Sequence, residues 1–241
     1  MRIAFMGQKG GVGKSTLSVG LACELARRRR VLLLDADKPQ YSAATWAEGG
    51  AVERLEVRRG EDPRADFRDW PEEVDVVIDC PGRLDEFSRA ALVAADLAIL
   101  PVSPSGLEQW TLESGLDLAQ RANEARSREG RPPVTVRLLR TRWRPGPLAS
   151  GVEAQHPSEL WLRSTVRELQ AFRVAMSTGR PVYALAAWAE AAADIKTLVK
   201  ELRGLHEQRE EGRHPQAAAR GEDTNRVLRR GSGAGASPSR P

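Results

Sequence analysis

Residues 7–16 read Gly-Gln-Lys-Gly-Gly-Val-Gly-Lys-Ser-Thr, and this stretch decides the fold of the 241-residue chain. An apolar run at residues 3–6 precedes it, and leucines at positions 17, 21 and 25 form a helical pattern after it. A strand, a glycine-rich loop and a helix in this order make a loop that binds phosphate groups. The glycines let backbone N–H groups turn toward one anion, and the following helix directs its positive end to the same point. The stretch therefore predicts a nucleotide-binding α/β domain.

Two side chains of this loop predict its chemistry. Lys14 can reach the β- and γ-phosphates of a nucleotide, and the hydroxyl of Ser15 can bind Mg²⁺. The alternative is a glycine-rich turn with two solvated lysines, which the agreement of the glycines, the Lys-Ser pair and the flanking elements disfavours. The nucleotide-binding residues expected from the loop are Gly10, Gly11, Val12, Gly13, Lys14, Ser15 and Thr16.

The loop departs from the standard pattern G-x-x-x-x-G-K-[ST] at its first glycine, where this chain has Gln8, and it carries a second lysine, Lys9. In this it resembles the deviant Walker A loop of the ParA/MinD family of P-loop ATPases. The resemblance covers residues 1–204 and is closest to the small plasmid-type ParA partition proteins. It implies an ATP-dependent homodimer in which Lys9 reaches across the interface to the partner's phosphates.

Acidic residues close two of the expected buried strands. Residues 31–34 run into Asp35-Ala36-Asp37, and residues 74–78 run into Asp79. The carboxyl edge of a parallel sheet is where α/β proteins bind ligands, so these carboxylates face the phosphate loop and can hold Mg²⁺ and a water. The metal-binding residues expected here are Ser15, Asp35 and Asp79.

The family resemblance adds roles for these acids. Asp37 matches the second aspartate of the A′ motif, which is linked to positioning the attacking water, and Asp79 matches the Walker B aspartate. The catalytic set implied is Lys9, Lys14 and Asp37, with ATP and Mg²⁺ as cofactors. Lys38 is a one-residue insertion in the A′ motif and Tyr41 replaces its usual glycine, so the geometry of hydrolysis at Asp37 is less secure than nucleotide binding.

The remaining pattern predicts a doubly wound, mostly parallel α/β sheet with helices on both faces. Helices are expected after the phosphate loop as far as the arginines at 27–30, and at residues 84–95, 110–126, 167–175 and 185–202. Strands are expected at residues 3–6, 31–34, 54–57, 74–78, 97–102, 134–139 and 160–166.

Composition limits the class of protein and its location. Two cysteines without metal-ligand spacing indicate buried thiols in a reducing cytoplasm, and the immediate strand leaves no room for a signal peptide. The longest apolar runs are too short for a transmembrane helix. We expect one ATPase domain at residues 1–204 and a disordered tail at 205–241, rich in Gly, Ser, Pro and Arg, that cannot form an amphipathic membrane helix. The chain is expected to be cytoplasmic, with no membrane partner.

Two basic regions are candidate DNA contacts, given a net charge of +4. Lys196, Lys200 and Arg203 follow one face of the last expected helix, where family members contact the DNA backbone. Arg140 and Arg142 belong to an arginine-rich segment at residues 131–144 that contains Trp143. A solvated lysine face and a solvated loop are the alternatives. The asparagine with which family members often read adenine is replaced by this arginine segment, so base recognition is unassigned.

The function implied by the resemblance is ATP-dependent DNA segregation. ATP closes a dimer, the dimer binds DNA non-specifically and associates with the nucleoid, and a ParB-like centromere-binding partner stimulates hydrolysis. One alternative is a family member that positions a protein assembly or assists DNA transfer. Another is a biosynthetic enzyme of the cobyrinate-synthase type, for which the sequence offers no acceptor site.

Overall fold

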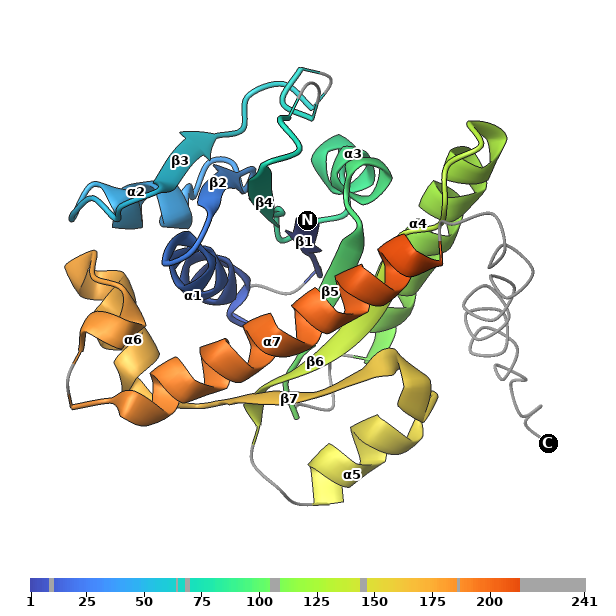
Figure 1. The fold of residues 1–241 in the computed structure, drawn as a ribbon. Helices are drawn as coiled ribbons and strands as arrows, with labels where there is room; N and C mark the ends of the chain where they lie inside the picture. The colour runs from blue at the N-terminus through green and yellow to red at the C-terminus, as the bar shows by residue number, and fades with distance from the viewer. Residues whose placement is uncertain are drawn as a thin grey trace.

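A single parallel sheet organises the chain. The computed structural model describes residues 1–8, 11–63, 65–67, 70–104, 109–143, 147–185 and 187–212. Seven strands lie in the order β3-β2-β4-β1-β5-β6-β7, and every neighbouring pair is parallel (Figure 1). The strands are β1 Arg2–Phe5, β2 Arg30–Asp35, β3 Leu55–Arg59, β4 Val74–Asp79, β5 Leu97–Val102, β6 Thr135–Trp143 and β7 Trp161–Arg167.

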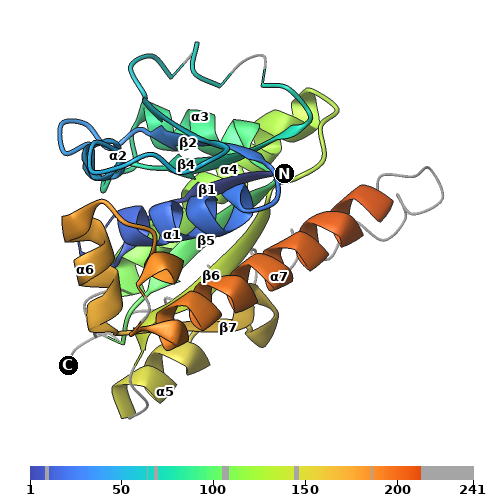
Figure 2. The same cartoon turned by 60° about the vertical axis from the view of Figure 1, so that its left-hand side comes forward.

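Helices cover both faces of this sheet, as Figures 1 and 2 show. Side chains alternate between the faces along each strand: Ile3 and Phe5 enter one core, and Ala4 and Met6 enter the other. The first core packs against α1, α2, α6 and α7, and the second against α3 and α4. The helices are α1 Lys14–Ala26, α2 Ser42–Ala47, α3 Glu86–Ala94, α4 Gln109–Arg128, α5 Pro147–Ala154, α6 Gln170–Thr178 and α7 Ala189–Glu211.

The order of the strands positions the phosphate loop. The chain leaves β1 toward β2 on one side, returns to β4 next to β1, and then continues to β5 on the other side. Ligands of doubly wound sheets bind at the carboxyl ends of the strands where the order reverses. The loop after β1 therefore lies between the ends of β4 and β5.

The doubly wound fold and all seven strands are confirmed, with differences at the ends of elements. β6 continues to Trp143, four residues past the expected end, because it pairs with β7 through two register irregularities. Arg167 ends β7 and does not begin a helix, and α6 starts at Gln170. The short helices α2 and α5 were not predicted. Both cysteines are buried free thiols.

The last helix, α7, is longer than expected. It continues to Glu211, so the predicted start of the tail at residue 205 falls inside the helix. Leu205 packs against the core, and Arg209 donates to the carbonyl of Pro133 and has its Nε 3.9 Å from Asp96 Oδ1. These contacts extend the folded domain past residue 204. Within the part of the chain that the structure describes, no helix combines the length and apolarity needed to cross a membrane.

From these contacts we expect that removing the last turns of α7 lowers the thermal stability of the domain. A chain ending at Gly204 should melt roughly 5 °C below one ending at Gly212, because it loses the burial of Leu205 and the anchor at Asp96. Thermal unfolding of the two chains measures the difference. Equal melting temperatures would show that the last turns of α7 do not stabilise the domain.

Candidate functional site

The phosphate loop begins the site. Gly11 and Gly13 have φ angles of 82° and 95°, in the left-handed region that favours glycine, and Gly13 is the N-cap of α1. Lys14 opens α1 and is only 5% exposed. The loop thus places a buried ammonium at the N-terminus of a helix, an arrangement that attracts an anion. Two residues of the predicted set, Lys9 and Gly10, lie outside the described residues.

Asp79 ends β4 in the interior, next to α1. Its side chain is fully buried, and its Oδ1 accepts a hydrogen bond of 3.2 Å from the hydroxyl of Ser18. Burial raises the pKa of Asp79 to about 7, although a hydrogen bond from Ser15 and the charge of Lys14 oppose this rise. Its other oxygen, Oδ2, has no hydrogen-bond partner among the described residues.

The unpaired Oδ2 of Asp79 indicates whether the site can accommodate Mg²⁺. A buried carboxylate oxygen without a partner is costly, and a hydrated cation next to it would satisfy it. The described residues form no cluster of three or more His, Cys, Asp or Glu that could hold a metal ion. Mg²⁺ commonly binds to one or two protein oxygens together with substrate phosphates, so Ser15 and Asp79 suit it better than an all-protein cage.

Asp35 has a structural task that the sequence did not reveal. Its Oδ1 accepts the N–H of Asp37 at 3.2 Å, and its Oδ2 accepts those of Ala43 and Ala44 at 2.8 and 2.9 Å. Burial raises the pKa of Asp35, and these backbone hydrogen bonds oppose the rise. The carboxylate thereby shapes the turn after β2 and starts α2. Its assignment as a metal ligand stays a prediction.

Asp37 faces the phosphate loop from the end of β2. Its Oδ1 accepts a hydrogen bond of 3.4 Å from the N–H of Gly82, in the loop after β4. A Cβ on Gly82 would lie 3.7 Å from Lys14 Nζ, so this loop approaches the same ammonium. Asp37, Gly82 and Lys14 therefore meet around one point, where a terminal phosphate and a water could sit.

The inserted residue does not displace Asp37. Lys38 Nζ donates to the carbonyl of Glu61 at 2.9 Å and lies 5.7 Å from the ring centroid of Phe87, so the side chain contacts the segment after β3 and α3. Tyr41 has a φ of 43°, which explains why glycine is usual at its position. Its hydroxyl donates to Gly60, and its N–H donates to the carbonyl of Asp37 at 2.9 Å.

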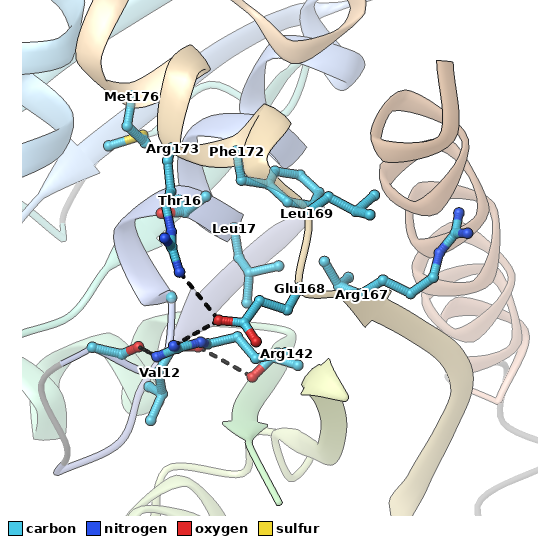
Figure 3. Close-up of a pocket in the computed structure, with 14 residues that line it drawn as sticks. Val12, Thr16, Leu17, Arg142, Arg167, Glu168, Leu169, Phe172, Arg173 and Met176 are labelled. Carbon is cyan, nitrogen blue, oxygen red and sulfur yellow. Dashed lines mark hydrogen bonds and ion pairs between the residues drawn. The ribbon is translucent and has the colours of Figure 1, made fainter. Parts of the chain in front are cut away.

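A cavity of about 280 Å³ adjoins the phosphate loop (Figure 3). Its apolar walls include Leu17, Leu169, Phe172 and Met176. Most ligand pockets are largely apolar with a few polar groups, and a flat base fits such a space. The cavity lies beside residues 11–17, so a nucleotide with its phosphates on the loop can place its base here. The lining side chains come from α1, the ends of β6 and β7, and α6.

The polar rim of this cavity connects distant segments. Arg142 donates to the carbonyl of Gly11 at 3.0 Å and to Glu168 at 2.9 Å, and Arg173 donates to Glu168 at 3.2 Å (Figure 3). Thr141 donates to the carbonyl of Val12 at 3.1 Å. Base recognition was unassigned from the sequence because the asparagine that family members often carry is absent, and no motif connects these residues, which are far apart in the chain.

The five candidate DNA contacts do not form one surface. Arg142 lies at the phosphate loop, and Arg140 pairs with Glu153 and stacks 4.9 Å from the ring of Trp161. Arg203 Nη2 lies 3.7 Å from Asp75 Oδ2. Lys196 and Lys200 are exposed on α7. Which of these five residues contact DNA stays a prediction.

Comparison with known sequences finds two relatives that carry the same name. It is 39% identical over 157 residues to the maintenance of carboxysome distribution protein A of Gloeobacter kilaueensis, which covers 64% of this chain and 68% of the relative. It is 28% identical over 211 residues to the protein of the same name from Halothiobacillus neapolitanus, covering 83% and 95%.

Solved structures share the fold at low identity. Apo McdA of Cyanthece superimposes with a TM-score of 0.66 at 16% identity, over 81% of this chain and 98% of that chain. The AMPPNP-bound putative plasmid partition protein of Borrelia burgdorferi gives 0.63 at 17%, over 81% and 96%. The Pyrococcus furiosus cell division ATPase MinD gives 0.59 at 20%, over 85% and 99%.

A family match covers most of the chain. The family described as the CobQ/CobB/MinD/ParA nucleotide binding domain aligns with residues 3–221. That range contains the phosphate loop, the aspartates at the ends of β2 and β4, and the cavity beside them. The chain thus belongs to the CobQ/CobB/MinD/ParA nucleotide-binding family.

Proposed function

We propose that this protein is a Mg²⁺-dependent ATPase that dimerises on ATP and positions a cargo on DNA. The observation that supports it most is the meeting of Lys14, Asp37 and the loop at Gly82 around one point beside the orphaned oxygen of Asp79. A site built only to hold a nucleotide would not need a second carboxylate next to the place of the terminal phosphate.

Each group of the site has a role in this proposal. Lys14 and the N–H groups of the loop bind the phosphates, and Ser15 and Asp79 would hold Mg²⁺, which neutralises charge on the phosphates when bound. Asp37 orients the attacking water, and Lys9 reaches the nucleotide of the second subunit. The base of the nucleotide lies in the cavity lined by Phe172, where the base packs against apolar side chains.

The cargo proposed first is a protein assembly. Two sequence relatives are named carboxysome distribution proteins, and the longer of these two alignments spans 95% of its relative. DNA partition with a ParB-like partner is the second candidate, because a Rhizobium radiobacter protein named ParA is 30% identical over 127 residues. In both cases the ATP-bound dimer binds DNA non-specifically, and the protein resides in the cytoplasm, associated with the nucleoid.

Dimerisation separates the roles of the two loop lysines. With MgATP, Lys14→Ala should neither bind nucleotide nor dimerise, since it removes the charge that meets the phosphates. Lys9→Ala should bind nucleotide within about threefold of wild type but stay monomeric, because its contact lies across the interface. Calorimetry and sedimentation with a non-hydrolysable analogue measure both properties. A dimer of Lys9→Ala would remove the proposed contact between subunits.

Replacing Asp79 should have opposite effects on stability and binding. A folded-state pKa raised from 3.8 to about 7 means that folding favours the neutral carboxyl, a contribution to stability that is fully present below pH 3.8 and is lost as pH rises from there through 7. Asp79→Asn stays neutral, so without nucleotide its melting temperature should match wild type near pH 4 and exceed it by several degrees at pH 8. Its affinity for nucleotide with Mg²⁺ should fall.

Thermal unfolding across this pH range and calorimetry test that expectation. Glu56→Gln is the control, because Glu56 is exposed on β3 and should show no such pH dependence. A melting difference that is constant from pH 4 to pH 8 would contradict the raised pKa of Asp79.

DNA binding can be assigned to α7 by its salt dependence. Lys200→Ala should weaken binding of the MgATP dimer to duplexes of any sequence and flatten the log–log salt slope by about one to two units, one contact per subunit. Lys196→Ala should behave in the same way. Arg58→Ala, an exposed cation on the opposite edge strand, is the control. If the wild-type dimer binds no DNA at low salt, the protein does not position its cargo on DNA.

A further inference from the structure

Helix α2 connects the aspartate turn to another part of the molecule. Its first turn is attached to Asp35, which accepts the N–H groups of Ala43 and Ala44 as well as that of Asp37. The N–H of Thr45 donates to the carbonyl of Tyr41 at 2.9 Å, which continues this hydrogen bonding into the helix. A displacement of α2 would therefore carry the turn that contains Asp37 with it.

The other end of α2 is fixed to α6. The indole Nε1 of Trp46 donates a buried hydrogen bond of 3.1 Å to the carbonyl of Ala175. Just beyond the two helices, the backbones of Gly49 and Gly179 touch, since a Cβ on Gly179 would lie 2.4 Å from Gly49 Cα. Both views of the fold place α2 next to the end of α6 (Figures 1 and 2).

Helix α6 is also a wall of the cavity beside the phosphate loop. Phe172, Arg173 and Met176 line it, and Ala175 lies between the last two in the sequence (Figure 3). The carbonyl that accepts the indole thus belongs to the turn of α6 that carries lining side chains. The same turn joins the rim, because Arg173 pairs with Glu168.

We propose that Trp46 is a positioning residue that sets Asp37 according to whether a base fills the cavity. The inference rests on the proposed function for the identity of the site. A base that packs against α6 restricts the movement of that helix. The indole of Trp46 and the Gly49–Gly179 contact then hold α2 in place. Because Asp35 binds both α2 and the N–H of Asp37, the position of α2 sets the position of Asp37. Trp46 is 3% exposed within the core, and its indole donates to α6, so we assign it an action through α2.

The variant Trp46→Phe removes the hydrogen bond and retains an aromatic ring. Its kcat for ATP should fall roughly 3- to 10-fold, while its affinity for ADP should stay within about twofold of wild type, since an intramolecular hydrogen bond contributes on that scale. Trp161→Phe is the matched control, because the buried Nε1 of Trp161 has no hydrogen-bond partner in the described part of the chain. It should leave kcat unchanged.

Hydrogen exchange supplies a measurement that does not depend on hydrolysis. In wild type, ADP should protect the amides of Ala43 and Ala44 more than pyrophosphate does, because only ADP brings a base. In Trp46→Phe the two ligands should protect these amides equally. Met176→Ala shortens a side chain of α6 that lines the cavity, so the base packs less firmly against this helix. This variant should also reduce the ADP-specific protection.

The outcomes separate the inference from the function on which it rests. ADP-specific protection that survives in Trp46→Phe, or a loss of kcat matched by an equal loss of ADP affinity, would overturn the positioning role. An unchanged kcat in Trp46→Phe would do the same. Absence of ATP hydrolysis by wild type would instead contradict the proposed ATPase, and the exchange comparison with ADP would still decide whether the cavity and α2 are coupled.

Discussion

The site depends on an imbalance of buried charge at the carboxyl edge of the sheet. Three aspartates, at positions 35, 37 and 79, converge there on one buried lysine. Desolvation of carboxylates is costly unless hydrogen bonds or cations compensate it. Backbone N–H groups satisfy Asp35, and Asp79 responds with a raised pKa. The cation that accompanies a nucleotide would supply positive charge next to Asp79, and Lys14 would meet the phosphates, so nucleotide binding depends on the internal electrostatics of the domain.

Local patterns carried most of what could be predicted from the sequence. The phosphate loop, the apolar strands and the aspartates that end them are contiguous in the chain, and each has a physical signature in a few residues. The doubly wound class of the sheet follows because a loop of this kind leads into such a sheet, whereas the order of its strands was not predicted. The loop pattern also named candidate phosphate-binding residues, whose assignment stays a prediction, and Lys9 and Gly10 lie outside the described residues.

Features that depend on side chains distant in sequence were not predicted. The rim of Arg142 and Glu168 joins segments 26 residues apart, and no periodicity reveals such a pairing. Helix α2 begins because a carboxylate eight residues earlier accepts its N–H groups. Arg203 looked like part of a free basic face, but a buried aspartate on β4 lies next to it. Sequence patterns identify which residues are charged, and only the fold decides which charges remain available.

The extent of α7 has a practical consequence for observing the protein at work. Its last turns are anchored at Asp96, which precedes β5, and Arg203 is anchored at Asp75 near the start of β4. Both anchors lie at the amino edge of the sheet, whereas the nucleotide site lies at the carboxyl edge. Residues of the last turns of α7 line a pocket together with Met1. A fluorophore attached at Gly212 would therefore follow the movement of the protein in a cell from a position remote from its nucleotide.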